Sequence, residues 1–179
     1  IEELAEIDES VEALAGGAGT ARGSGGMSSK VAAAKIAAWS GVRALIAAAS
    51  RPDVLADAVA GTPGVGTMVQ PRNDRLPARK LWIAFAVASK GTIVVDDGAR
   101  RALIDRGVSL LPAGVVDAKG GFEVDAAVEV AGTDGRVFAK GLVRYDAVGL
   151  REVRGQRTSQ LPESASHEVI HRDDLVVLP

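Results

Sequence analysis

The sequence contains no cysteine, which excludes disulfide bonds and thiolate zinc sites and fits a reducing cytoplasm. It also has no apolar run near the roughly 20 residues of a membrane-spanning helix, so we expect no membrane partner. The formal net charge of −2 provides no global attraction to nucleic acid. Aromatic residues make up only 3% of the chain, whereas alanine and glycine are abundant. Ala-rich helices packed closely on buried strands favour an α/β architecture, and we expect a cytoplasmic protein.

The first half of the sequence predicts alternating helices and strands. The run 42–48 is continuously apolar and bounded by turn residues, as is typical of a buried strand. Asp8 can cap one helix, while Pro52 and Gly61 bracket another. The expected helices are 8–15, 30–40 and 53–60, and the expected strands are 42–48 and 66–69. Strand, helix and strand in alternation predict a mainly parallel α/β layer with flanking helices.

The pattern changes after Pro71. A charged segment is followed by the apolar residues 81–87, which can complete a connecting helix, and we place the domain boundary between residues 88 and 89. The second half then shows short strands separated by turn dipeptides such as Gly120-Gly121. The expected strands are 92–95, 114–117, 127–130, 137–145 and 168–178, with a helix at 98–106. This pattern predicts a small β-rich barrel over residues 89–179.

The segment 23–30, Gly-Ser-Gly-Gly-Met-Ser-Ser-Lys, carries the strongest chemical signal. Its glycines precede a helix that Ser28 or Ser29 can cap, and Lys30 lies in the first turn of that helix. A cation at this end opposes the helix dipole, unless an anion is bound there by the free N–H groups and the ammonium together. Backbone donors, hydroxyls and one lysine are most of what phosphoryl transfer asks of a protein.

A plainer interpretation of the same segment is a solvated Gly/Ser loop followed by a surface lysine. The segment is not a Walker A loop, because the Gly-Lys-[Ser/Thr] ending is missing. A P-loop fold therefore does not follow from it, and composition alone leaves the phosphate site and the plain loop both open.

The order of further segments resolves this choice. The segment 23–30, with Ala33-Ala34 and 46–50 after it, resembles the Gly-Thr-Gly-Gly-Met-x-Thr-Lys segment and following strand of glutamate 5-kinases. The resemblance continues in the same order to the end of the chain. It includes Gly66-Thr67, Arg79-Lys80-Leu81-Trp82-Ile83, Gly91-Thr92-Ile93-Val94-Val95-Asp96, Ser109-Leu110-Leu111-Pro112-Ala113-Gly114-Val115 and His171-Arg172-Asp173-Asp174.

This resemblance implies the end of an amino-acid kinase domain, over residues 1–88, followed by a PUA domain over residues 89–179. It implies transfer of the ATP γ-phosphoryl group to the side-chain carboxylate of L-glutamate, the first step of proline biosynthesis. Mg²⁺ would be held mainly through the ATP phosphates. The implied nucleotide-binding residues are Ser24, Gly25, Gly26, Met27, Ser28, Ser29 and Lys30. Lys30 is also the implied catalytic residue, stabilising the transferring phosphoryl group.

The family's N-terminal half, with its first phosphate loop and its glutamate-binding residues, has no counterpart in this sequence. The sequence also begins Ile-Glu-Glu-Leu, without an initiator methionine or the order of a signal peptide. We therefore expect a part of a longer chain that is inactive alone, with ATP and L-glutamate as substrates of the whole enzyme. A homo-oligomer is also expected.

Other candidate motifs have structural explanations. His171-Arg172-Asp173 imitates the catalytic motif of protein kinases but lacks its companion motifs, and we expect a tail strand there. The pair His167 and His171 has no further clustered ligands that would make a metal site. Asp96, Asp97 and Asp125 could hold Mg²⁺ in principle, but turns and a helix start explain them better. We assign no residue as a metal ligand.

The second half is locally basic, and PUA domains elsewhere bind structured RNA through shape and phosphate contacts. The alternative function is therefore an RNA-binding PUA module with a non-catalytic α/β appendage. Only Phe122 and Tyr145 are nearby candidates for base stacking, so we favour a solvated or intersubunit basic face. Its members are Arg100, Arg101, Arg106, Arg144, Arg151, Arg154 and Arg157.

Overall fold

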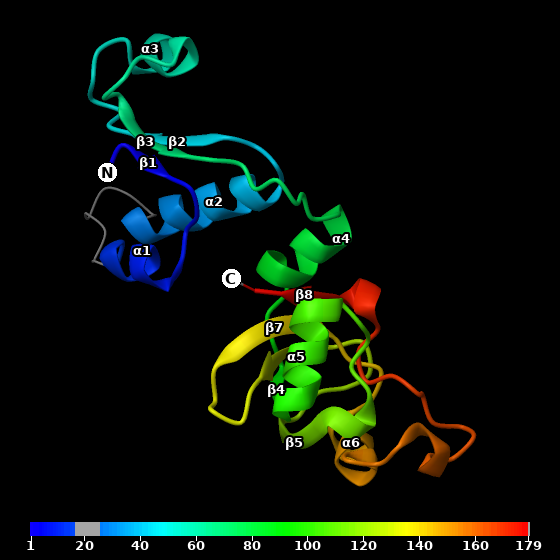
Figure 1. Ribbon diagram of the computed structural model, residues 1–179. Coiled ribbons are helices and arrows are strands. Elements are labelled where there is room, and N and C mark those ends of the chain that lie inside the picture. The colour runs from blue at the N-terminus through cyan, green and yellow to red at the C-terminus, as the bar shows by residue number, and fades with distance from the viewer. Residues whose placement is uncertain (17–25, 179) are drawn as a thin grey trace. The chain divides into compact units, whose positions relative to one another are not determined.

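The computed structural model describes residues 1–16 and 26–178. The chain forms two compact units, Ile1–Ala78 and Arg79–Pro179, and each is described here by itself. The first unit is an α/β layer and the second is a β-rich barrel with short helices (Figure 1). This arrangement confirms the predicted fold class.

The first unit packs helices against a three-stranded sheet. Its strands are β1 (Glu3–Leu4), β2 (Ala44–Ala47) and β3 (Gly66–Val69), and its helices are α1 (Glu9–Leu14), α2 (Met27–Trp39) and α3 (Val54–Ala60). The sheet order is β1-β3-β2. The buried face of α2 carries Val31, Ala34 and Ala38, spaced so that one helix face meets Val69 of the sheet. Figure 1 shows α2 running beneath the strands.

The two longer strands of this unit run in opposite directions. β1 pairs with β3 in parallel, but β2 pairs with β3 antiparallel, with Ala44 opposite Val69 and Ala47 opposite Gly66. The parallel direction that the sequence favours for 42–48 and 66–69 is therefore wrong. The physical reason is that α3 does not cross over the sheet, since Val59 on this helix is 91% exposed and the helix has no buried residue.

The second unit is built on a five-stranded sheet of order β5-β4-β6-β7-β8. The strands are β4 (Gly91–Val95), β5 (Val115–Gly120), β6 (Ala127–Ala131), β7 (Val137–Leu142) and β8 (Leu175–Val177). The helices are α4 (Ala78–Leu81), the π-helix η1 (Trp82–Ala86), α5 (Asp97–Arg106) and α6 (Ala147–Val153), with 3-10 turns η2 (Pro112–Gly114), η3 (Thr158–Gln160) and η4 (Arg172–Asp174). β4 and β6 pair in parallel, and the other neighbours are antiparallel.

One core holds this barrel together. Its fully buried members include Ile93 on the inner strand β4, Leu103 on α5 and Leu150 on α6. Helix α5 begins at Asp97 because the Asp96 carboxylate accepts a hydrogen bond from the Ala99 N–H at 2.7 Å. This core is larger than the one that the described residues of the first unit form.

The edge strand β5 is covered by an arginine from α6. The Arg151 guanidinium donates to the Ala118 carbonyl at 3.0 Å and to the Gly120 carbonyl at 2.7 Å. β5 ends the sheet order, so these oxygens have no further strand to pair with. The arginine satisfies them in place of a strand.

The division between the units falls inside α4, after its first residue. The connecting helix expected at 81–87 is an α-helical turn followed by the π-helix, and it belongs by its contacts to the barrel unit. The last strand is shorter than expected, since residues 172–174 form the 3-10 turn η4 and β8 covers only Leu175–Val177.

Gly141 on β7 lies where the sheet has no room for a side chain. A Cβ there would lie 2.6 Å from Cγ2 of Ile170 and 2.8 Å from the Asp174 carbonyl oxygen. We expect Gly141→Ala to destabilise the barrel by about 1–3 kcal/mol, because overpacking forces backbone and side-chain shifts. The measurement is the calorimetric unfolding transition of the barrel.

Gly121→Ala is the matched control, because a Cβ at Gly121 would meet no atom within 4 Å. Its transition temperature should stay close to that of the parent. Equal shifts for the two variants would contradict the steric explanation.

Candidate functional site

The start of α2 is open at its N-terminal end. Gly26 is the N-cap residue and makes no side-chain cap hydrogen bond, and the first turn contains no acidic residue. The Ser29 hydroxyl donates to the Gly26 carbonyl at 2.8 Å, so neither Ser28 nor Ser29 is the N-cap that the sequence suggests. The backbone N–H groups of this first turn and the positive end of the helix dipole thus have no carboxylate from the turn itself beside them.

Five of the predicted nucleotide-binding residues lie together on this turn. Gly26 is followed by Met27, Ser28, Ser29 and Lys30 as the first four helical residues. The side chains of all four are exposed. Ser24 and Gly25, which belong to the same prediction, lie outside the described residues. The structure therefore places the predicted lysine and two of the three predicted serine hydroxyls at one helix end.

A cavity of about 630 Å³ adjoins this turn. Lys30 is the one charged side chain among its described lining residues. The rest of the lining is mostly apolar and comes from α1, the start of α2 and the ends of β2 and β3. It includes Val11, Leu14, Met27, Ile46, Ala48 and Thr67. A cavity with apolar walls and one cation fits a ligand with a flat apolar body and anionic groups.

Segments far apart in the sequence meet at this cavity. Lys30 lines it together with Gly66 and Thr67, and with residues 46–49. Both of these segments carry the family resemblance. Sequence reasoning did not identify Val11 and Leu14 as lining residues, because their spacing indicates only the apolar face of a short helix. A lining role for them depends on the packing of α1 against α2, which no local pattern encodes.

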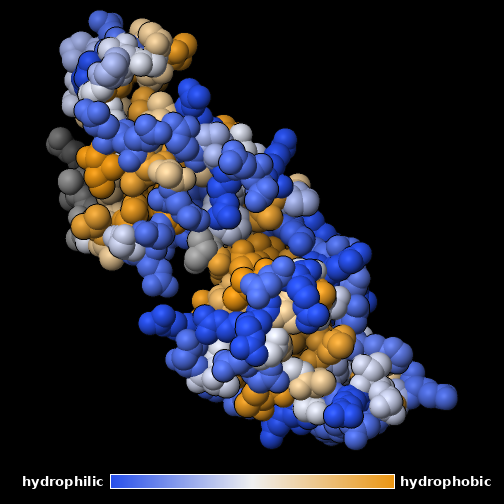
Figure 2. All heavy atoms as spheres, viewed as in Figure 1, coloured by the Kyte–Doolittle hydropathy of each residue, from blue (hydrophilic) through white to orange (hydrophobic). Residues whose placement is uncertain are grey.

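Lys30 also lines a second, smaller cavity of about 320 Å³ between α2 and β2. The lining there is otherwise apolar and includes Ala34 and Leu45. The exposed lysine side chain therefore lies at the edge of two hollows in the surface of this unit. Figure 2 shows apolar residues gathered over this part of the chain.

Three other candidate residues, His171, Asp174 and Asp96, have structural roles. His171 is the N-cap of η4, and its Nδ1 accepts from the Asp173 N–H at 3.2 Å. Asp174 accepts a hydrogen bond from Arg79, and Asp96 caps α5. No group of three or more His, Asp or Glu side chains that could hold a metal ion occurs within residues 1–16 and 26–178.

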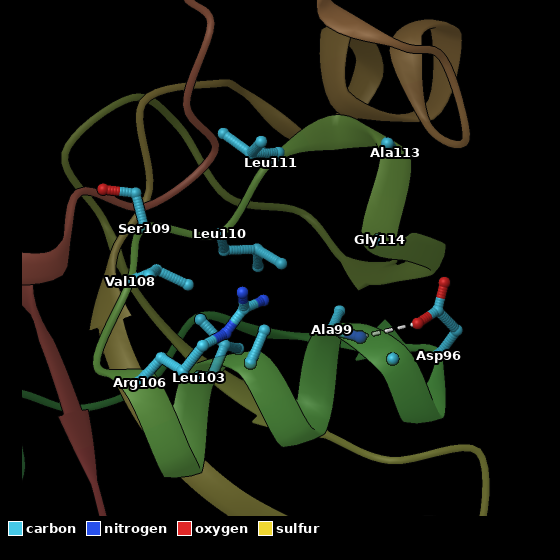
Figure 3. Close-up of a pocket in the computed structure, with 12 residues that line it drawn as sticks. Asp96, Ala99, Leu103, Arg106, Val108, Ser109, Leu110, Leu111, Ala113 and Gly114 are labelled. Carbon is cyan, nitrogen blue, oxygen red and sulfur yellow. Dashed lines mark hydrogen bonds between the residues drawn. The ribbon is translucent and has the colours of Figure 1, made fainter.

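The barrel unit has a cavity of its own, of about 340 Å³, between α5 and residues 108–114 (Figure 3). Its walls are mostly apolar and include Leu103, Leu110 and Leu111. The Arg106 side chain extends along α5 toward Leu110, whereas the Asp96 carboxylate is engaged with the Ala99 N–H. The sequence analysis did not predict this cavity, although residues 109–115 belong to the family resemblance.

In the described part of the chain, every helix is too short or too polar to cross a lipid bilayer.

Known proteins give two kinds of match. The family model of the PUA domain matches residues 91–163. The chain is 42% identical to the glutamate 5-kinase of Syntrophus aciditrophicus over 177 residues, which is 97% of this chain and 46% of the relative. It is 44% identical to the glutamate 5-kinase of Geobacter sulfurreducens, over 97% of this chain and 47% of the relative.

The chain is homologous to the glutamate 5-kinases. The glutamate 5-kinase of Caldanaerobacter subterraneus also matches, at 41% identity over 99% of this chain and 49% of the relative. The match confirms the resemblance predicted from 23–30 and the segments after it. The chain spans about half the length of the curated glutamate 5-kinases that it matches.

Solved structures also match part of the chain. A PUA domain from Aeropyrum pernix K1, in a tartrate complex, is 26% identical and covers 53% of this chain and 49% of its own, with a TM-score of 0.37. A conserved PUA domain protein from Thermoplasma acidophilum is 21% identical and covers 57% of this chain and 60% of its own, with a TM-score of 0.35.

Proposed function

We propose that this chain supplies the ATP-side loop and the PUA domain of a glutamate 5-kinase. The reaction is transfer of the ATP γ-phosphoryl group to the side-chain carboxylate of L-glutamate, which gives L-glutamyl 5-phosphate for proline biosynthesis. Homology to glutamate 5-kinases over 97% of the chain supports the reaction class. The single observation that supports the site is the open start of α2, with Lys30 at the edge of an apolar cavity.

The proposed roles follow from the chemistry of each group. The N–H groups of the first turn of α2 bind phosphate oxygens, and the helix dipole favours their negative charge. The Ser28 hydroxyl can donate to the same oxygens, and the Ser29 hydroxyl can do so when it leaves the Gly26 carbonyl. The apolar walls of the cavity suit the flat, weakly polar base of the nucleotide. Lys30 places a compact positive charge where the transferring phosphoryl group develops its charge.

Mg²⁺ in this proposal is held mainly by the ATP phosphates, and no described side chain is assigned to it. The site fits such an arrangement because the first turn of α2 has no acidic residue of its own to repel the nucleotide. The metal would neutralise phosphate charge, while this chain orients the phosphates. Because the chain spans about half of its relatives, we propose that binding of L-glutamate and turnover need further residues.

A nucleotide titration of the chain tests the proposal. We expect calorimetry to show that ATP with Mg²⁺ binds more tightly than AMP by about tenfold or more, because only the longer phosphate chain engages Lys30 and the helix end. The Lys30→Ala variant should lose that preference while keeping the weaker AMP binding.

Lys35→Ala is the matched control. Lys35 lies on the same helix, but its ammonium is engaged with Glu12 at 2.6 Å. This variant removes the same charge and should keep the preference for ATP. Equal affinity for ATP and AMP in the parent chain would contradict the proposed phosphate site.

A further inference from the structure

Three basic side chains hold residues 79–87 against the barrel. The Arg79 Nε donates to Oδ1 of Asp174 at 2.6 Å, and the Lys80 Nζ donates to the Arg172 carbonyl at 3.1 Å. Both acceptors lie on η4, directly before β8. The third contact comes from Lys140 on β7, whose ammonium donates to the Ala84 and Val87 carbonyls at the end of the π-helix.

Lys140 is unusual for its burial. Its exposed fraction is 8%, and it is the one buried charged residue in the part of the chain that the structure describes. Burial lowers its pKa, while Glu129, opposite Lys140 in the β6–β7 register, favours the charged form. The carbonyls at the end of a helix have no donors within the helix, and the Lys140 ammonium supplies them.

Asp174 is, besides Lys140, the second barrel side chain that bonds to residues 79–87. Its side chain is only 16% exposed, and Arg144 adds a second guanidinium, with its Nη2 3.8 Å from Oδ2. The neighbouring Asp173 is different, because its side chain is 73% exposed and its carboxylate oxygens lie 3.6 Å from the His171 Nδ1 and 3.9 Å from the Arg172 Nε. Of two adjacent carboxylates, one is thus half-buried beside Arg79 and the other faces solvent.

The residues before this segment are held to the first unit. The Arg72 N–H donates to the Ala38 carbonyl at 3.0 Å, and the Arg72 guanidinium lies 4.5 Å from the Trp39 ring centroid. Arg72 also pairs with Glu6 at 2.9 Å. After Arg72 the described contacts with the first unit are fewer. The Leu76 N–H donates to the Trp39 carbonyl at 3.2 Å, and the Arg75 side chain lies over Gly41.

We propose that the joint of the chain lies at residues 73–78, and that residues 79–87 are a fixed extension of the barrel, locked by Arg79, Lys80 and Lys140. Residues 79–87 therefore move together with the barrel. The backbone of residues 73–78 changes conformation to allow that motion. This inference stands on contacts of the barrel unit and does not depend on the proposed phosphate site.

Limited trypsin digestion of the full chain, analysed by mass spectrometry, tests the joint. Arg75 lies in the proposed joint, whereas Arg79 and Lys80 lie in the locked segment, so all three are potential cleavage sites in one short stretch. We expect early cleavage after Arg75, with cleavage after Arg79 and Lys80 slower by about tenfold or more, because proteolysis requires local opening. Equal early cleavage at all three sites would overturn the proposal.

The lock itself is tested by two matched substitutions. Asp174→Asn should raise cleavage after Arg79 and Lys80 relative to Arg75, whereas Asp173→Asn should leave the ratio unchanged. Arg79→Gln is the second variant, because Arg79 is 61% exposed and its loss leaves the barrel core intact. It should raise cleavage after Lys80. An unchanged ratio in both Asp174→Asn and Arg79→Gln would show that these contacts do not lock the segment.

Discussion

Replacement of Lys30 by alanine, in a full-length enzyme that contains this sequence, is expected to lower turnover by on the order of 10²-fold or more. This is the usual scale for loss of one preorganised charge that stabilises a transition state. Lys30 stands on the first turn of α2, where an exposed ammonium can reach an anion that the helix end also binds. Steady-state kinetics with ATP and L-glutamate are the measurement.

Two further variants make this result specific. Lys30→Arg should restore activity only in part, because a planar guanidinium does not replace a compact ammonium. Lys35→Ala, which removes a lysine paired with Glu12 on the same helix, should leave turnover near that of the parent. Turnover of the Lys30→Ala enzyme within a few-fold of the parent would remove Lys30 from the catalytic role.

The largest effect on stability is expected at Ile93. This residue is fully buried on β4, between Ala118 on β5 and Val130 on β6. Ile93→Ala should lower the free energy of unfolding of the barrel by about 2–5 kcal/mol, through lost burial and the cavity that remains. The calorimetric unfolding transition of the barrel measures the change.

Ile104→Ala is the matched control, because Ile104 is 45% exposed on α5. The same pair of residue types is exchanged there with little burial to lose, and alanine favours the helix. Its effect should stay within about 0.5 kcal/mol. A similar loss for both variants would show that Ile93 does not anchor the core.

Local signals in the sequence predicted local structure well. Asp8 and Asp96 cap their helices through side-chain hydrogen bonds, and Gly61 ends α3 in the left-handed conformation that glycine adopts easily. Features that depend on tertiary contacts were not predicted. The antiparallel pairing of β2 depends on where α3 packs, and the π-helix depends on a lysine more than fifty residues away.

The helix α6 was also missed, although its signal is present. Asp146 caps it, and Ala147, Leu150 and Val153 are buried at a spacing of three residues. A helix of about two turns is hard to separate from a loop by that pattern, and Gly149 weakens the helical signal further.

Only the part of the candidate site that depends on local sequence was predicted. The turn from Gly26 to Lys30 follows from adjacent residues, so the sequence alone could indicate it. The cavity beside it requires α1, β2 and β3 to converge, and Thr67 reaches it only through strand pairing. The domain boundary expected after residue 88 stays a prediction, whereas the compact units divide after Ala78.

Arg151, which covers the carbonyls of β5, also has a consequence for how molecules of this chain meet in solution. An open strand edge is a template for pairing with another polypeptide, and a charge placed on that edge prevents such pairing. In the barrel, the Arg151 guanidinium places such a charge on the edge of β5. The edge strand β2 of the first unit is Ala-Leu-Ile-Ala, which carries no charge at all. Pairing of two chains edge to edge should therefore be less hindered at β2 than at β5.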